Sequence, residues 1–179
     1  MTILIKTDGK KYYVNVWVTV IILGIAYSTV ALMNQYLLES LLLGGIYTLL
    51  LLLAQSDLVY GRLPNSYLLV MLVLGVIHMV VDGNVVEKLL CFALFFIPFS
   101  IMRVIFHMEI GGGDIKLMAF MALYMGIPVL YAIFIACMLC VMVVVYKITM
   151  RHGKGKMIPF GPYMAIGVYL YYTGIWIFR

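Results

Sequence analysis

The sequence predicts an all-α membrane protein, a polytopic bundle of about seven transmembrane helices. Two observations lead to this fold class. Of the 179 residues, 66% are hydrophobic and 11% are charged, and the mean hydropathy is +1.14, whereas soluble domains carry about 25% charged residues. The apolar residues also gather in runs close to the ~20 residues that a helix needs to cross a bilayer. No soluble domain is expected from such a composition.

Short polar segments divide the chain into these runs. The run at 14–34 is longer than the ~7–15 apolar residues of a secretory signal, so a retained span is expected. The second run, 37–56, ends on Asp57, and the fourth contains Pro98 as an expected kink. The later spans are expected at 66–81, 87–106, 114–124, 129–146 and 163–178.

The glycine and proline at 126–128 leave two alternatives for residues 114–146, one long kinked helix or a helical hairpin. The positive-inside rule decides between them. With seven spans and a cytoplasmic N-terminus, 10 of the 12 Lys and Arg residues lie inside, whereas a single helix would move the basic loop 147–156 outside. The hairpin is therefore predicted, and it puts Asp57 and Asp114 at the cytoplasmic face.

Asp57 and Asp114 are the candidate catalytic residues. A charged side chain costs roughly 2.5–3.5 kcal/mol at mid-bilayer, so a carboxylate at the mouth of a membrane helix indicates function. Two carboxylates that share a proton can hydrolyse a peptide bond. This chemistry requires the second and fifth spans to be neighbours in the bundle. The alternative for either residue is an interfacial carboxylate that only faces water and headgroups.

Other candidates flank the two aspartates. Three consecutive glycines precede Asp114, and glycine allows both a positive φ and the close approach of another chain. Two basic residues near the aspartates can bind a substrate carboxylate or a headgroup phosphate, or can snorkel to the interface. The substrate-binding or site-shaping candidates are Gly111, Gly112, Gly113, Lys116, Arg62, Pro64, Asn65, Pro159, Phe160, Gly161 and Pro162.

Neither a metal nor another cofactor is expected. Cys91, Cys137 and Cys140 lie within apolar runs, where a redox or zinc motif would lack access. No His, Cys and Asp spacing is typical of a metal site. No basic patch with interleaved aromatic residues stands outside the spans, so nucleic-acid binding is not expected, and the net charge of +5 is interpreted as topology.

Taken together, these residues resemble the type IV prepilin peptidase family, the G-x-G-D aspartyl proteases of bacterial and archaeal inner membranes. Asp57 followed by the segment 62–65, Arg-Leu-Pro-Asn, is similar to the family's first aspartate and its I/L-P-N loop. The segment 111–117 matches its G-x-G-D-x-K-L motif, and the segment 158–163 resembles its P-F-G-P segment. The resemblance spans about residues 45–170.

The resemblance implies a membrane aspartyl endopeptidase with Asp57 and Asp114 as catalytic residues. Such enzymes cleave the basic leader peptide from type IV prepilins, or from related pilin-like or archaellin precursors, at the cytoplasmic face of the inner membrane. The lipid bilayer and these precursors are the implied partners. The cytoplasmic insert with two C-x-x-C pairs of bifunctional members is absent, so the sequence is similar to the short, peptidase-only form. Residues 1–179 are then one transmembrane peptidase domain, with an extra span in 1–36 and the catalytic core in 37–179.

Two other functions remain open. A non-enzymatic transporter or assembly scaffold would use the aspartates for ion or proton passage, although transporters place such groups near the bilayer middle in repeated segments. A G-x-G-D protease of the presenilin or signal-peptide-peptidase type would cut within a membrane span. The matches to the I/L-P-N and G-x-G-D-x-K-L motifs argue against this second type.

Overall fold

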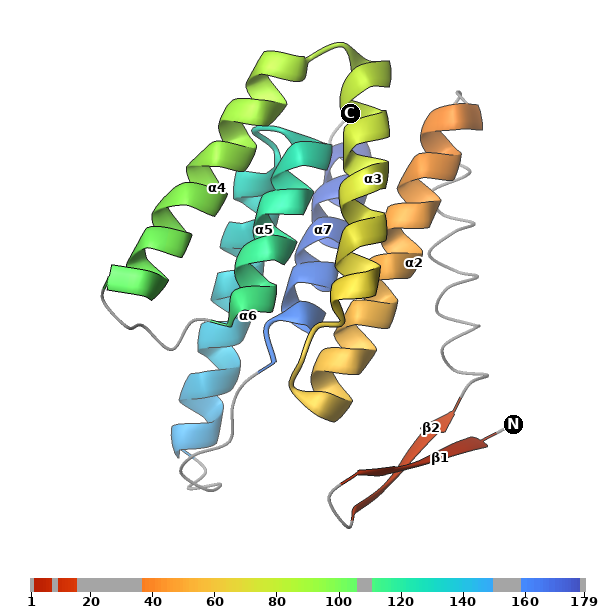
Figure 1. Ribbon diagram of the computed structural model, residues 1–179. Helices are drawn as coiled ribbons and strands as arrows, with labels where there is room; N and C mark the ends of the chain where they lie inside the picture. Colours follow the sequence, from red (N-terminus) through yellow and green to blue (C-terminus); the bar gives the residue numbers. More distant parts are fainter. Residues whose placement is uncertain (1, 8–9, 16–36, 106–110, 150–158, 178–179) are drawn as a thin grey trace.

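The computed structural model describes residues 2–7, 10–15, 37–105, 111–149 and 159–177 (Figure 1). Within them, the helices run side by side as one bundle, so the all-α class is confirmed for this bundle. The helices are α2 (Leu37–Tyr60), α3 (Asn65–Asp82), α4 (Val85–Ile105), α5 (Gly112–Met125), α6 (Val129–Thr149) and α7 (Gly161–Ile177).

A β-hairpin that the sequence analysis did not predict precedes the bundle. Strands β1 (Thr2–Thr7) and β2 (Lys10–Asn15) pair in antiparallel orientation. The second strand contains tyrosine and valine, which favour extended backbone. It includes Val14 and Asn15, so the span predicted at 14–34 does not begin at Val14. The rest of that predicted span lies outside the described residues.

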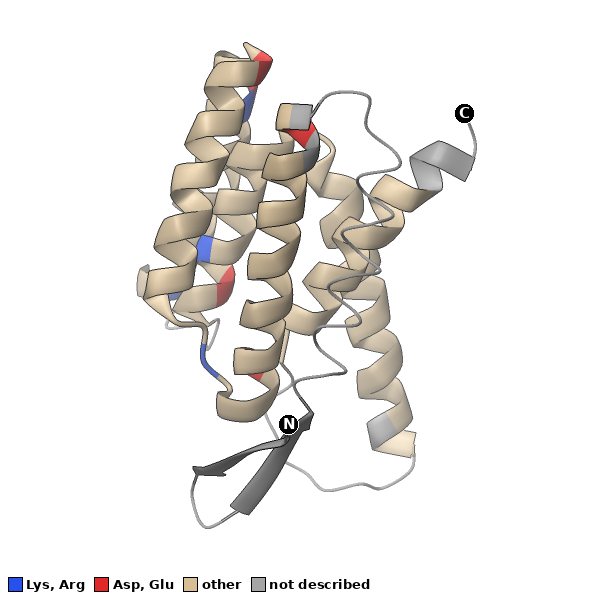
Figure 2. Cartoon of the chain, turned by 90° about the vertical axis from the view of Figure 1, so that its right-hand side faces the viewer, with Lys and Arg blue, Asp and Glu red and all other residues tan. Residues whose placement is uncertain are grey.

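Four of the described helices are long and apolar enough to cross a membrane, namely α2, α3, α4 and α6. Helix α5, with 14 residues, is shorter than a full span, and α7, with 17, lies at the lower limit for one. The predicted number of about seven spans is therefore not confirmed. Large apolar side chains such as Leu69, Val86 and Phe134 point outward from the longer helices. Figure 2 shows few charged residues along the bundle, as expected for a membrane protein.

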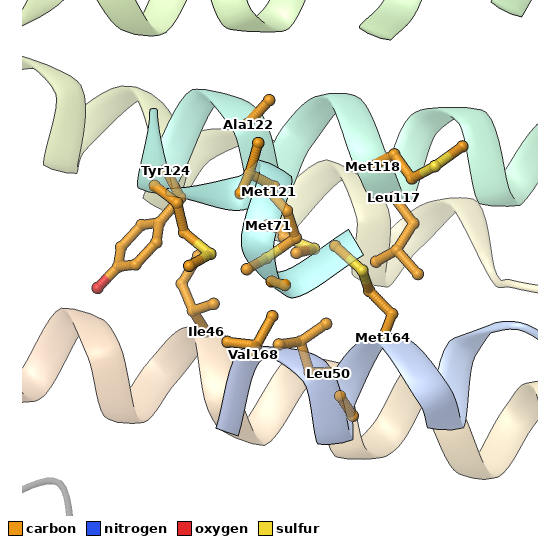
Figure 3. Packing of buried hydrophobic residues seen from close by; sticks show 14 of the residues in the cluster. Ile46, Leu50, Met71, Leu117, Met118, Met121, Ala122, Tyr124, Met164 and Val168 are labelled. Atoms are coloured by element: carbon orange, nitrogen blue, oxygen red, sulfur yellow. The ribbon is translucent and has the colours of Figure 1, made fainter. Parts of the chain in front are cut away.

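The bundle is organised around α5, whose side chains are mostly buried. Buried positions run from Ile115 to Met125 on all sides of this helix, which packs against α3, α4 and α6. Figure 3 shows Leu117 and Met121 of α5 facing Leu50 of α2 and Met164 of α7. Close van der Waals packing of this kind holds helices together in lipid, where no water drives them to associate.

Helices α5 and α6 form a hairpin, as the distribution of basic residues predicted. Gly126 ends α5 with a φ of +69°, and its N–H donates a 2.8 Å hydrogen bond to the Ala122 carbonyl. Helix α6 then returns along the bundle (Figure 1). The end of α2 and the starts of α3, α5 and α7 consequently lie at one end of the bundle, which we call the site end.

The second and fifth spans, which are expected to be neighbours in the bundle, correspond to α2 and α5. Helix α2 packs closely on α3 and α7, whereas α5 packs on α3, α4 and α6. Gly45 of α2 faces Leu74 of α3. Helices α2 and α5 meet mainly through core side chains. The two aspartates are therefore brought together by the helix ends and loops.

Candidate active site

Asp57 lies in the last turn of α2 with its side chain buried, 7% exposed. Its Oδ2 accepts a 2.8 Å hydrogen bond from the Gly161 N–H, which is 104 residues away in sequence. Gly161 is the first residue of α7, where backbone N–H groups lack partners within the helix. This bond joins the first aspartate to the Pro-Phe-Gly-Pro segment at 159–162.

The loop after Asp57 is fixed by its own hydrogen bonds. Gly61 has a φ of +61°, and its N–H donates to the Asp57 carbonyl at 2.9 Å. A glycine in the left-handed region commonly ends a helix in this way. The Ser56 hydroxyl donates a 3.0 Å hydrogen bond to the Arg62 carbonyl, and Pro64 precedes the first turn of α3. The Arg62 side chain itself is exposed.

Asp114 lies in the first turn of α5, outside the four helices that are long enough to cross a membrane. Its side chain is partly buried. Burial raises the pKa of Asp114 to about 6, and the nearby charge of Asp57 raises it as well. The two carboxylates thus interact electrostatically at the site end and are expected to titrate as a pair.

Two of the glycines before Asp114 have close neighbours at the position that a β-carbon would occupy. A β-carbon on Gly111 would lie 2.5 Å from Oδ2 of Asp114, and one on Gly113 would lie 2.9 Å from the β-carbon of Leu63. Neither glycine has a positive φ. Close approach, and not a left-handed backbone, is therefore the physical reason for glycine at both positions. The Gly113 contact also joins this segment to the loop that follows Asp57.

Lys116 makes a second connection between the same two segments. Its Nζ donates a 3.1 Å hydrogen bond to Oδ1 of Asn65, the first residue of α3. Lys116 and Asn65, both predicted site residues, are therefore brought together, and the Lys116 ammonium is bound within the protein. Three segments that are far apart in the sequence meet at the site end through the pairs Asp57–Gly161, Gly113–Leu63 and Lys116–Asn65.

The third segment surrounds Asp57 from the side of α7. Pro159, Phe160 and Pro162 are partly buried there. The Phe160 carbonyl accepts a 3.1 Å hydrogen bond from the Met164 N–H and so begins the helical pattern of α7. Proline is tolerated at position 162, because the first N–H groups of a helix have no partner to lose.

Sequence analysis did not single out Arg103, which the structure places beside the glycines. Arg103 lies in the last turn of α4, and its guanidinium occupies the space that a β-carbon on Gly112 would need. The sequence could have indicated Arg103, because this residue lies at the end of an apolar run and 112 − 103 = 9 residues before Gly112. Leu63, in the Arg-Leu-Pro-Asn segment at 62–65, was likewise not predicted to be a site residue.

A second polar cluster lies at the opposite end of the bundle. Lys88 is 2% exposed, forms a 2.7 Å ion pair with Asp82 and makes a 2.8 Å hydrogen bond with Nδ1 of His78. Glu87 accepts a 3.1 Å hydrogen bond from the Ile127 N–H in the turn between α5 and α6. These contacts fasten the turn between α3 and α4 to the rest of the bundle.

The described residues contain no group of three or more His, Cys, Asp or Glu side chains placed to hold a metal ion. Within the described residues no two cysteines are joined by a disulfide, and Cys137 is exposed on α6. The reactive groups in the described part of the site end are the carboxylates of Asp57 and Asp114. Two carboxyl groups that share one proton can act on a bond that lies between them.

The chain matches a model of a known protein family. The model of the type IV leader peptidase family matches residues 44–145, more than half of the 179 residues, and includes both aspartates. No curated protein and no solved structure matched the chain. With the family match extending over α2 to α6, the chain belongs to the type IV leader peptidase family.

Proposed function

We propose that this protein is a membrane aspartyl endopeptidase that removes the basic leader peptide from type IV prepilins, or from related pilin-like or archaellin precursors. Membership of the type IV leader peptidase family supports a peptidase. The observation that carries the aspartyl mechanism is the convergence of three distant segments, including those that hold Asp57 and Asp114, at one end of the bundle. Asp57 and Asp114 are the proposed catalytic residues.

The proposed reaction is hydrolysis by a carboxylate pair that shares one proton. The ionised carboxylate takes a proton from water as the water oxygen attacks the scissile carbonyl carbon. The protonated carboxyl group gives its proton to the carbonyl oxygen. Attack and proton transfer together give a tetrahedral intermediate. The carbon–nitrogen bond then breaks as the nitrogen receives a proton from the first carboxyl group. The products are a carboxylic acid and an amine, and the oxygen's proton returns to the second carboxylate.

The position of the site fits a substrate with a polar leader and an apolar helix. The two aspartates lie at the ends of α2 and α5, while large apolar side chains cover the outer faces of α3, α4 and α6. A precursor helix can lie in the lipid beside these faces while its leader stays in water. The distribution of basic residues supports a cytoplasmic site and N-terminus in the inner membrane, with 37–179 as the catalytic core.

The test is cleavage of a synthetic peptide with a lysine-rich leader, a glycine and an apolar helix of ~20 residues, by the full chain in lipid nanodiscs. Mass spectrometry reports the cut. Asp57→Asn and Asp114→Asn are each expected to lower kcat by about 10²–10⁴-fold, the range for general acid–base catalysis. Glu39→Gln, which changes an exposed carboxylate in the first turn of α2, is the matched control and is expected to retain activity.

Cleavage is also expected to survive EDTA. A single aspartate variant that processes the peptide at near wild-type rate would contradict the proposal, as would loss of cleavage in EDTA that added zinc restores. If the wild-type chain cleaves nothing but moves ions or protons in liposomes, the transporter alternative takes its place.

A further inference from the structure

The two carboxylates at the site end have unequal surroundings. Asp57 is buried, and its Oδ2 accepts the 2.8 Å hydrogen bond from the Gly161 N–H. The backbone N–H of Phe160 also lies near this carboxylate. Among the described residues, none donates a hydrogen bond to the side chain of Asp114. Within the described part of the site end, Asp57 is therefore the member of the pair that fixed backbone donors hold.

Backbone N–H donors favour the charged form of a carboxyl group. The donors here belong to the N-terminus of α7, a helix of 17 residues, whose dipole places partial positive charge at that end. Two nearby carboxylates resist simultaneous ionisation, so one of them takes the proton. The donors stabilise a negative charge on Asp57, and Asp114 has no such donor among the described residues.

Gly161 is placed for this task by its missing side chain. A β-carbon on Gly161 would lie 3.1 Å from Asp57 Oδ2 and 3.4 Å from the Ala54 α-carbon, so any side chain would press on α2. The next residue, Pro162, has no N–H to offer. Of the first two residues of α7, only Gly161 therefore has an N–H, and this N–H donates the buried 2.8 Å hydrogen bond to Asp57.

We propose that Gly161 is a positioning residue that holds Asp57 as the ionised member of the pair. Asp57 then takes the proton from the attacking water, and Asp114 gives its proton to the oxygen of the scissile carbonyl. In the second half of the reaction Asp57 passes its proton to the leaving nitrogen, and the hydroxyl proton of the intermediate returns to Asp114. This assignment of roles rests on the proposed aspartyl peptidase function.

The test removes the Gly161 N–H without changing the shape of the chain. Cell-free translation into nanodiscs places glycolic acid at position 161, so that an ester oxygen replaces the N–H. The hydroxy analogue of tyrosine at position 163 supplies the matched ester control. For the ester at 161 we expect kcat to fall at least ~10-fold with KM nearly unchanged. We also expect the acidic limb of the kcat/KM pH profile to move up by about one pH unit, while the alkaline limb stays in place.

The second variant is Gly161→Ala, compared with Gly45→Ala on the same bundle, where an added β-carbon makes only a 3.4 Å contact with Leu74. Gly161→Ala is expected to lower kcat and Gly45→Ala to leave it unchanged.

A merely structural role for Gly161 would lower activity equally at every pH, and this result overturns the inference. If Asp57→Asn and Asp114→Asn abolish cleavage but the ester at 161 does not move the acidic limb, the inference alone fails. If the two aspartate variants retain cleavage, the proposed function fails.

Discussion

The Lys116 ammonium and the Asn65 carboxamide, 51 residues apart, are joined by a 3.1 Å hydrogen bond. Lys116 follows Asp114 by two residues, and Asn65 follows Asp57 by 65 − 57 = 8. The bond therefore connects the two segments that carry the aspartates, in addition to the core side chains through which α2 and α5 meet. Sequence analysis expected Lys116 to bind a substrate or headgroup or to snorkel, and the observed partner lies within the protein.

Removing either end of this tether is expected to lower activity by loosening the start of α5. Lys116→Met and Asn65→Ala should each reduce kcat/KM by about 5- to 10-fold, which corresponds to about 1 kcal/mol for a hydrogen bond at a solvent-accessible site. The double variant should be no worse than either single variant, because the interaction is already lost. Peptide cleavage rates measure this. Fully additive losses would show that the two residues act independently.

Alanine substitutions in the glycine segment are expected to differ in severity. Gly113→Ala should reduce both stability and activity, since its β-carbon would meet the β-carbon of Leu63 at 2.9 Å. Gly112→Ala should be mild, because the group that it meets is the mobile, exposed end of the Arg103 side chain. Gly111→Ala should reduce activity more than stability, since it displaces the Asp114 carboxylate. Thermal unfolding in detergent and cleavage rates compare the three. Equal effects at 112 and 113 would contradict this contact pattern.

The protonation of Asp114 should appear as a pH-dependent stability. Its pKa is raised from 3.8 to about 6, so the folded protein holds this proton more tightly than the unfolded chain does. Its contribution to stability is thus fully present below about pH 4 and is lost as the pH rises through 6. Asp114→Asn lacks this loss. The difference in the midpoint of thermal unfolding between the variant and wild type should therefore shift in favour of the variant as the pH rises from 4 to 7.

Asp57→Asn gives the control for that measurement. It removes the charge that helps to raise the pKa of Asp114, so the loss of stability should be smaller and should end at a lower pH than in wild type. Circular dichroism melting curves at a series of pH values report both variants. Parallel curves for wild type and Asp114→Asn would contradict the raised pKa.

The polar cluster at the opposite end should matter for stability and not for catalysis. Asp82→Ala leaves the buried Lys88 ammonium without its 2.7 Å partner and should cost about 1.5–3 kcal/mol, the range for a hydrogen bond to a charged group. Adding Lys88→Met removes the unpaired charge and should recover part of this loss. Chemical unfolding measures both, and initial cleavage rates at low temperature should stay near wild type. A double variant as unstable as Asp82→Ala would contradict this account.

The sequence by itself determined the helical membrane class and most helix boundaries. Every backbone N–H and C=O group needs a hydrogen-bond partner in lipid, and a long apolar run supplies these partners within itself when it forms a helix. Glycine and proline at 126–128 and the basic loop at 147–156 predicted the hairpin that α5 and α6 form. The hairpin of β1 and β2 was missed, because a short polar segment with a few tyrosines and valines carries a weak local signal.

Local sequence also marked Asp57, Asp114 and their flanking motifs, since a carboxylate at the end of an apolar run is costly enough to stand out. Only the tertiary structure decided how these residues are connected. The bond from Gly161 to Asp57 and the contact of Gly113 with Leu63 join segments tens of residues apart, and no spacing in the chain encodes them. They arise because helix ends from different parts of the sequence meet at one end of the bundle, where glycine lets backbone approach side chain closely.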